Sequence, residues 1–194
     1  MKIHLIFSLL LLTSLSPSLI SQEQKDKTAL IIIDIQEFYY PGGSSELFEP
    51  EAAGKKARQV LERFRENGDL VIHVRHNAAK GGDIHKDVAP IEGEKVISKD
   101  QVNSFRDTDL LAYLKENNIT DLVLVGMQTN MCLEAATRAG ADYGFKCTVI
   151  EDACATKDQK FGDHLVKAKD VHYVALATLR AYAKITNTET YLGK

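Results

Sequence analysis

Short apolar runs alternate along the chain with longer stretches in which apolar side chains recur at helical spacing. Residues 29–33 form a continuous, isoleucine-rich apolar run, which is typical of a strand buried on both faces. Similar runs predict further strands at 70–74, 95–98, 122–125, 147–150 and 182–185. Helical spacing predicts helices at 51–67, 108–117, 132–143 and 170–180. Because strands alternate with helices, we expect an α/β fold, a three-layer α-β-α arrangement with a mainly parallel, doubly wound, six-stranded sheet.

The first 21 residues differ from the rest of the chain. Lys2 precedes an almost wholly apolar run at 5–12, small and hydroxyl residues follow, and a charged stretch covers 22–27. This order is that of a secretory signal peptide, and the run is too short to span a bilayer comfortably. We therefore predict a cleaved signal peptide at 1–21, a single domain at 22–194, and a periplasmic or secreted protein without stable membrane insertion after cleavage. An uncleaved anchor is the alternative.

Composition and absent motifs limit the partners and cofactors. Charged residues make up 26% of the chain, the formal net charge is −3, and no long basic run occurs, so we expect no nucleic-acid partner. No Gly-x-Gly-x-x-Gly segment follows the first strand, and the sequence has neither a Gly-Lys-Ser/Thr phosphate loop nor a Gly-x-Ser-x-Gly elbow. These absences disfavour dinucleotide binding and serine-hydrolase chemistry, and we expect no cofactor.

Chemically versatile side chains follow several of the predicted strands. Asp34 follows the first strand, His76 the second and Lys99 the third, while the segment 126–132 follows the fourth. In open parallel sheets, ligands bind outside the carboxyl ends of the strands. We therefore expect these residues, which lie far apart in sequence, to converge at one site.

Cys132 is the candidate nucleophile of this predicted site. It follows a strand and a short turn and opens a predicted helix, whose positive amino terminus would lower the thiol pKa and favour a reactive thiolate. Taken singly, Cys132 could be a small packing residue, Asp34 a cap and Lys99 a solvated strand end. Together they form an acid–base and nucleophile set. Cys147 and Cys154 lie too far apart along one strand for a disulfide, and we expect both to be inert core thiols.

Several segments resemble the isochorismatase-like hydrolases, a superfamily that includes nicotinamidases, N-carbamoylsarcosine amidohydrolases and ureidoacrylate amidohydrolases. Residues 126–139, Gly-Met-Gln-Thr-Asn-Met-Cys-Leu-Glu-Ala-Ala-Thr-Arg-Ala, resemble the nucleophile segment, and residues 31–36, Ile-Ile-Ile-Asp-Ile-Gln, the strand with the catalytic Asp. Residues 40–43 are similar to the loop that follows, Lys99 with 103–105 to the catalytic Lys segment, and 152–156 to a segment after the fifth strand. The resemblance covers nearly the whole predicted mature chain.

The resemblance implies a cysteine hydrolase that cleaves a C–N amide bond of a small molecule. Asp34 would take the Cys132 proton, the sulfur would attack the substrate carbonyl, and water would hydrolyse the resulting thioester. Lys99 would keep Asp34 ionised. A non-proline cis peptide at Met127–Gln128 is also implied, with the backbone N–H groups of Gln128 and Cys132 forming an oxyanion hole. The presence of the Cys favours amide chemistry, because true isochorismatases cleave a vinyl ether and generally lack it.

Position and resemblance together suggest which residues contact substrate. The candidates are Gln36, Phe38, His76, Asn103, Phe105 and Asn130. Nicotinamidases bind a metal through an Asp and several His, but Val74-Arg75-His76 lacks their Asp-x-His segment, so we expect no metal. His76 and His85 leave this point open. The resemblance also implies a homo-oligomer, since related proteins often complete their pockets with neighbouring subunits.

Two other interpretations remain. One is ether or ester hydrolysis on the same scaffold. The other is a non-catalytic binding or thiol module, although the chain has no Cys-x-x-Cys pair for disulfide exchange.

Cleavage of the signal peptide has a direct test. Ser18 and Ser21 are small enough to precede a cleavage site, so the mature chain should begin at Leu19 or Gln22. Intact-mass spectrometry of protein recovered from outside the cytoplasm of expressing cells measures its first residue. A recovered chain that begins at Met1 would show an uncleaved anchor instead.

Overall fold

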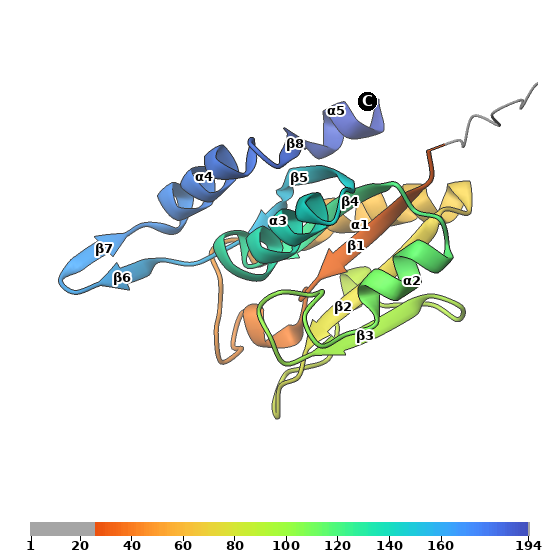
Figure 1. The fold of residues 1–194 in the computed structure, drawn as a ribbon. Helices are drawn as coiled ribbons and strands as arrows, with labels where there is room; N and C mark the ends of the chain where they lie inside the picture. Colours follow the sequence, from red (N-terminus) through yellow and green to blue (C-terminus); the bar gives the residue numbers. More distant parts are fainter. Residues whose placement is uncertain (1–25, 194) are drawn as a thin grey trace, which may run out of the picture.

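A computed structural model describes residues 26–193, and six parallel strands form its central sheet. The strands lie in the order β3-β2-β1-β4-β5-β8, and every neighbouring pair is parallel (Figure 1). Their bounds are Thr28–Ile33 (β1), Leu70–His76 (β2), Lys95–Lys99 (β3), Asp121–Met127 (β4), Lys146–Ala155 (β5) and Ala183–Thr186 (β8). The predicted α/β fold with a parallel six-stranded sheet is confirmed.

Helices cover both faces of the sheet. One face carries α1 (Pro50–Asn67) and the short α5 (Thr188–Leu192). The other carries α2 (Leu110–Glu116), α3 (Glu134–Asp142) and α4 (Ala168–Leu179). Within residues 26–193 no helix is both long enough and apolar enough to cross a membrane. The predicted signal peptide lies outside this part of the chain.

The first strand shows why the sheet has a core on each side. Ile31 and Ile33 pack into the core beneath α2 and α3, whereas Leu30 and Ile32 pack into the core beneath α1. None of these four side chains is more than 1% exposed. A strand buried on both faces needs apolar residues at every position, which explains the continuous run in the sequence.

The fifth strand is longer than its apolar run. The run ends at Ile150, but β5 continues through Glu151 and Asp152, past an irregularity in its pairing with β4. Asp152 accepts hydrogen bonds from the backbone N–H and the hydroxyl of Thr188, at 2.8 and 2.7 Å. Charged side chains are tolerated at such a bulge when they find partners outside the core. A prediction based on hydrophobicity therefore ended this strand too early.

A short hairpin and α5 were absent from the predicted elements. The hairpin consists of β6 (Gln159–Phe161) and β7 (His164–Val166), which pair antiparallel across a turn containing Gly162 at φ 59°. Figure 1 shows it projecting away from the sheet. Strands of three residues contain too few positions to reveal a hydrophobic alternation, which is why the sequence pattern did not indicate them.

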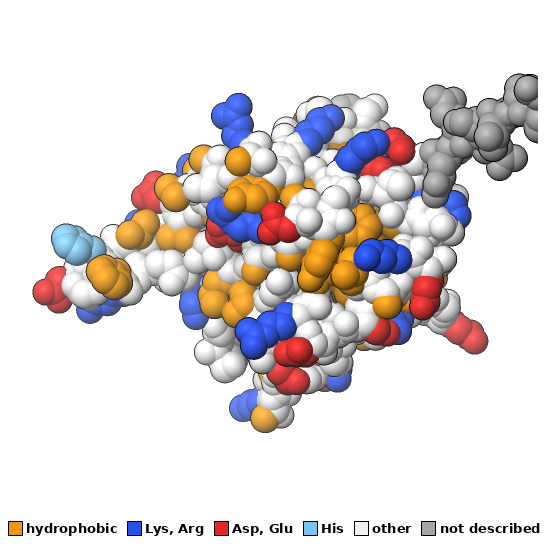
Figure 2. Space-filling view, in the orientation of Figure 1, with side chains coloured by type: hydrophobic (Ala, Val, Ile, Leu, Met, Phe, Trp, Pro, Cys, Tyr) orange, Lys and Arg blue, Asp and Glu red, His pale blue; other side chains and the backbone are white. Residues whose placement is uncertain are grey.

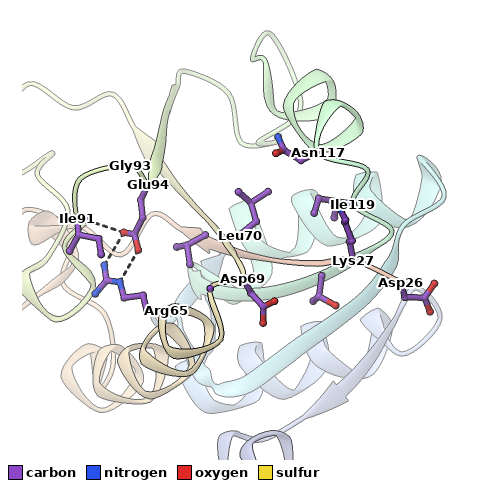
Figure 3. A pocket seen from close by; sticks show the side chains of 13 residues that line it. Asp26, Lys27, Arg65, Asp69, Leu70, Ile91, Gly93, Glu94, Asn117 and Ile119 are labelled. Carbon is purple, nitrogen blue, oxygen red and sulfur yellow. Dashed lines mark hydrogen bonds and ion pairs between the residues drawn. The ribbon is translucent and has the colours of Figure 1, made fainter. Parts of the chain in front are cut away.

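A pocket of about 690 Å³ lies at the amino ends of β1 and β2, opposite to the predicted site. In its wall Glu94 accepts hydrogen bonds from Arg65, at 2.7 and 2.8 Å, and from the N–H of Ile91, at 3.0 Å (Figure 3). His73, fully buried in β2, lies 2.8 Å from the same carboxylate. Although burial opposes ionisation of Glu94, these hydrogen bonds prevail and lower its pKa to about 2. The wall of this pocket therefore contains a structural ion pair between Arg65 and Glu94.

This ion pair makes stability depend on pH. Because the pKa of Glu94 falls from 4.5 to about 2 on folding, its contribution is complete above pH 4.5 and is lost as the pH falls toward 2. Glu94→Gln should therefore lower the free energy of unfolding at pH 7 by about 2 kcal/mol and flatten the loss of stability across this range. Urea denaturation at several pH values measures both effects. Glu92→Gln, at an exposed neighbour, is the matched control, and equal behaviour of the two variants would contradict this account.

Candidate active site

Three side chains from separate parts of the chain meet at the carboxyl end of the sheet. Asp34 directly follows β1, Lys99 ends β3, and Cys132 lies in the π-helical turn Thr129–Leu133 after β4. The Lys99 ammonium nitrogen (Nζ) lies 2.7 Å from Asp34 Oδ2 and 3.3 Å from Cys132 Sγ. One cation therefore bridges a carboxylate and a thiol.

A glycine allows the two central strands to approach each other beside this cluster. Gly126 lies opposite Ile33, has φ 132°, and could not carry a Cβ without colliding with the Ile33 carbonyl oxygen. Asp34 itself adopts a left-handed conformation at φ 50°, and its N–H donates to the Val74 carbonyl at 2.9 Å. Together, these features place the residue after β1 next to the segment that leaves β4.

The turn that carries Cys132 begins at a cis peptide. The Met127–Gln128 bond is cis, at the position that the family resemblance implied. The carbonyl of Gln128 then accepts hydrogen bonds from the N–H groups of Met131 and Leu133, at 3.0 and 3.3 Å. These bonds close the turn and fix Cys132 within it.

All three side chains of the cluster are shielded from water. Asp34 is 0% exposed, Lys99 2% and Cys132 6%. Burial raises the pKa of the Asp34 carboxyl, and the Lys99 ammonium opposes this rise. A desolvated carboxylate of raised pKa is a stronger base than an exposed one, which suits proton abstraction. The second oxygen of Asp34, Oδ1, is buried and has no hydrogen-bond partner among residues 26–193, so it is free to accept a proton.

The sequence-based expectation of a resting thiolate is wrong. Burial and the charge of Asp34 raise the pKa of the Cys132 thiol to about 12, and the opposing effect of Lys99 is smaller. The expectation relied on a helix amino terminus, but Cys132 lies in the turn before α3 and beside a carboxylate. That carboxylate cancels much of the field of the ammonium. The resting thiol is therefore protonated and neutral.

Two of the substrate-binding candidates, Gln36 and Phe38, follow Asp34 closely. Gln36 is fully buried and its amide donates to the carbonyls of His76 and Gly82, at 2.9 and 2.7 Å, while its oxygen accepts from the His76 N–H at 2.8 Å. Gln36 thus connects the loop after β1 to the loop after β2. Phe38 is largely buried and packs edge-on against Tyr39, with ring centroids 4.2 Å apart.

The other four candidates, His76, Asn103, Phe105 and Asn130, lie on three separate segments. His76 ends β2, and its Nδ1 is buried without a hydrogen-bond partner in the described part of the chain. Asn103 accepts a hydrogen bond from the N–H of Phe105 at 2.9 Å, in the loop after β3. Asn130, in the turn that carries Cys132, accepts one from the Thr156 hydroxyl at 2.6 Å. Contact of these residues with a substrate stays a prediction.

Sequence reasoning missed two contacts beside the cluster. The Tyr39 hydroxyl accepts a hydrogen bond from Gln128 Nε2 at 3.4 Å, and burial raises the pKa of Tyr39 to about 12. His172 of α4 lies 2.9 Å from the hydroxyl of Thr129. The position of Tyr39 in the aromatic segment after Asp34 was a usable signal. Nothing in the sequence linked His172 to a residue 43 positions earlier.

Two further cysteines and His85 bear on thiol and metal chemistry. Cys147 and Cys154 are buried, free thiols, as expected. Among the described residues, no three His, Cys, Asp or Glu side chains come together in an arrangement that could hold a metal ion. The His85 ring stacks on Tyr40 with centroids 3.6 Å apart, and its Nδ1 accepts from the N–H of Asp87.

The chain folds around a parallel sheet and has a buried cluster of a carboxyl group, an ammonium group and a thiol at the carboxyl end of that sheet. Comparison with known proteins identifies the class of protein that has this fold. The Isochorismatase domain matches residues 28–190. The protein is 41% identical over 177 residues to the isochorismatase family protein YddQ of Bacillus subtilis strain 168, across 85% of this chain and 98% of that protein. A crystal structure of an Oleispira antarctica protein, described as an isochorismatase hydrolase, has a TM-score of 0.84 and 39% identity, across 88% of this chain and 98% of that chain.

The chain therefore belongs to the isochorismatase family. Some relatives act on amides. Maleamate amidohydrolase of Pseudomonas putida strain KT2440 is 28% identical over 175 residues, across 71% of this chain and 82% of that protein.

The charge balance around Cys132 can be tested without a substrate. Asp34→Asn leaves the Lys99 ammonium unopposed beside the thiol and should lower the thiol pKa. Alkylation of Cys132 by iodoacetamide at pH 8 should then be about tenfold faster for each unit by which the pKa falls. Mass spectrometry of the Cys132 peptide measures the rate. Asp107→Asn, an exposed isosteric control, should leave it unchanged, and slower alkylation in Asp34→Asn would refute the assigned charges.

Proposed function

We propose that this protein is a cysteine hydrolase that cleaves a C–N bond of a small, non-peptide amide through a thioester on Cys132. The observation that carries the proposal is the contact of one ammonium, that of Lys99, with both the Asp34 carboxyl group and the Cys132 sulfur, all three side chains being buried. These groups are a base, a nucleophile and a cation that can stabilise either anion.

The first half of the reaction moves one proton and forms one bond. The free Oδ1 of Asp34 accepts the thiol proton as the sulfur attacks the substrate carbonyl, and negative charge moves to the carbonyl oxygen. Lys99 stabilises the sulfur while it carries negative charge. Because the thiol is neutral at rest, proton transfer and attack are coupled, and the sulfur becomes strongly nucleophilic only when a carbonyl is in place.

Collapse of the tetrahedral intermediate breaks the C–N bond. The protonated Asp34 returns its proton to the departing nitrogen, which an amine requires because its unprotonated anion is a poor leaving group. The acyl group stays on Cys132 as a thioester. Asp34, ionised again, then takes a proton from water, whose oxygen attacks the thioester carbonyl. The C–S bond breaks to release a carboxylic acid, and Asp34 returns its proton to the departing sulfur, which restores the thiol and the carboxylate.

The oxyanion formed in both halves needs hydrogen-bond donors, and we assign the backbone N–H groups of Gln128 and Cys132 to this role. Both belong to the short turn that the cis peptide begins, and backbone donors in a turn fixed by its own hydrogen bonds need little reorganisation during the reaction. The maleamate amidohydrolase relative supports an amide substrate. Action outside the cytoplasm is also part of this proposal and rests on the sequence of the first 21 residues.

A panel of small primary and substituted amides tests the reaction class. Release of ammonia or amine, with the matching carboxylic acid, is the expected result. Cys132→Ala and Asp34→Asn should each lower kcat by about 10⁴-fold, because each removes a member of a unit that acts together. Cys147→Ala removes a buried thiol outside the site and should retain activity.

The same panel distinguishes the alternatives. Turnover of an ether or ester without amine release from any amide would contradict C–N cleavage. Full activity in Cys132→Ala would contradict the cysteine mechanism. A protein that binds amides without releasing any product would be a binding module instead.

A further inference from the structure

His76 lies between the two residues of the buried ion pair. It ends β2, which lies between β3 and β1 in the sheet, and it is the register partner of Lys99 on β3. The residues two positions earlier on these strands, Val74 and Ile97, pack beneath α2 and α3. Because side chains alternate across a strand, His76 and Lys99 project from this same face. Lys99 therefore reaches Asp34 by crossing the strand that carries His76.

The backbone of His76 is held in place by a buried side chain. Gln36, which is fully buried, donates to the His76 carbonyl at 2.9 Å and accepts from the His76 N–H at 2.8 Å. The next residue, Asn77, donates its N–H to the carbonyl of Lys99 at 2.9 Å. These bonds fix the backbone at and after His76, so the fold sets the position of its imidazole closely.

The imidazole itself has an unsatisfied nitrogen. His76 Nδ1 is buried and has no hydrogen-bond partner within residues 26–193, and the same is true of Asp34 Oδ1. Buried polar atoms normally have a partner, so each of these two atoms needs one. The charge of His76 is among the effects that lower the pKa of Asp34, so the two groups are close enough to interact. One small polar molecule between them would satisfy both atoms.

A polar pocket of about 430 Å³ adjoins the imidazole. The loop after β2 forms it, and Arg75, His76, Asn77 and Asp83 contribute its polar side chains. Asn77 and Asp83 are exposed, so the pocket opens to solvent. His76 is half-buried and lines this pocket, while its Nδ1 is shielded from solvent. The imidazole therefore lies between solvent and the buried carboxyl group of Asp34.

We propose that His76 is a further catalytic residue, whose Nδ1 holds, together with Asp34 Oδ1, the water that hydrolyses the thioester on Cys132. This inference rests on the proposed function, because it assigns a place to the water in the second half of that reaction. A water molecule that donates one hydrogen to each of these two atoms keeps its lone pairs free to attack the thioester carbonyl.

The step balances without a change of charge on His76. As the water oxygen bonds to the thioester carbon, the hydrogen facing Asp34 moves to Oδ1, and the other hydrogen stays on the oxygen of the new carboxylic acid. The C–S bond breaks, and Asp34 returns its proton to the sulfur. The imidazole, with its hydrogen on Nε2, only accepts a hydrogen bond. Formation of the thioester uses no water, so it does not depend on His76.

The two halves of the reaction can be followed separately with p-nitrophenyl acetate, which transfers an acetyl group to Cys132 and releases p-nitrophenolate. Absorbance measures that release, and mass spectrometry of the Cys132 peptide follows the loss of the acetyl group. His76→Phe and His76→Ala both remove Nδ1. Each should leave the initial release unchanged and slow acetyl loss at least about tenfold, because the attacking water loses one of its two hydrogen bonds.

Two further variants separate the loss of the nitrogen from a general disturbance. His76→Asn keeps a polar atom near the position of Nδ1 and should restore most of the rate of acetyl loss. His164→Phe makes the same substitution at an exposed histidine of β7, and Figure 2 shows a histidine side chain on the projecting hairpin. It should change neither rate. Circular dichroism of each variant checks that it is folded.

The outcomes distinguish this inference from the proposed function. Acetyl loss at the wild-type rate in His76→Phe and His76→Ala would overturn the role of His76 and leave the cysteine mechanism intact. So would equal slowing of both steps, or a His76→Asn variant as slow as His76→Phe, since either result indicates a structural role. Absence of an acetyl group on Cys132 of the wild-type protein would overturn the thioester, and this inference with it.

Discussion

The carboxyl end of this sheet is organised by one buried ion pair, between Lys99 and Asp34. Two opposite charges 2.7 Å apart and fully buried remain stable only as a pair, since removing one leaves an uncompensated charge in a medium that solvates it poorly. The pair also connects β3, at the edge of the sheet, to β1, two strands away. The same ammonium contacts the Cys132 sulfur, so the thiol lies in a field set by both charges.

That field gives the thiol a specific resting state. An ammonium alone would lower the thiol pKa and favour the thiolate, whereas a carboxylate alone would raise the thiol pKa and favour the neutral thiol. With both present, burial and the carboxylate prevail and the proton stays on sulfur. A neutral buried thiol resists oxidation and nonspecific alkylation. This state is compatible with the proposed reaction, in which Cys132 loses its proton only as a substrate carbonyl arrives. In the proposed reaction that proton goes to the Asp34 oxygen that is buried and has no hydrogen-bond partner among residues 26–193.

The elements that depend on a hydrophobic pattern could be predicted from the sequence. The run at 29–33 predicts β1 because a strand buried on both faces leaves no position for a polar side chain. Asp34, Lys99 and the segment 126–132 converge because parallel strands end at one edge of the sheet. The extension of β5 was missed because Glu151 and Asp152 interrupt the apolar pattern while finding partners elsewhere. The thiol pKa was misjudged because it depends on burial and on the nearby charges of Asp34 and Lys99 rather than on a helix terminus.

Other features were beyond a reading of the sequence for similar reasons. The contact of His172 with Thr129 depends on where α4 packs, and the hairpin at 159–166 is held by pairing over too few residues to leave a pattern. The contacts within the loops that border the site could not be predicted either. Gln36, for example, hydrogen-bonds to backbone groups of His76 that only folding brings near it. Local sequence patterns thus predict the strands, whereas the pKa values and hydrogen bonds of the site depend on contacts between residues far apart in the sequence.

The most direct measurement is a search for the covalent intermediate. An amide that is turned over is mixed with the protein, the reaction is stopped with acid within the first turnovers, and the peptide containing Cys132 is weighed by mass spectrometry. The expected result is that this peptide alone gains the mass of the acyl group and loses it again on treatment with hydroxylamine. Sustained turnover with an unmodified Cys132 peptide, or with the acyl group on another residue, would contradict the account.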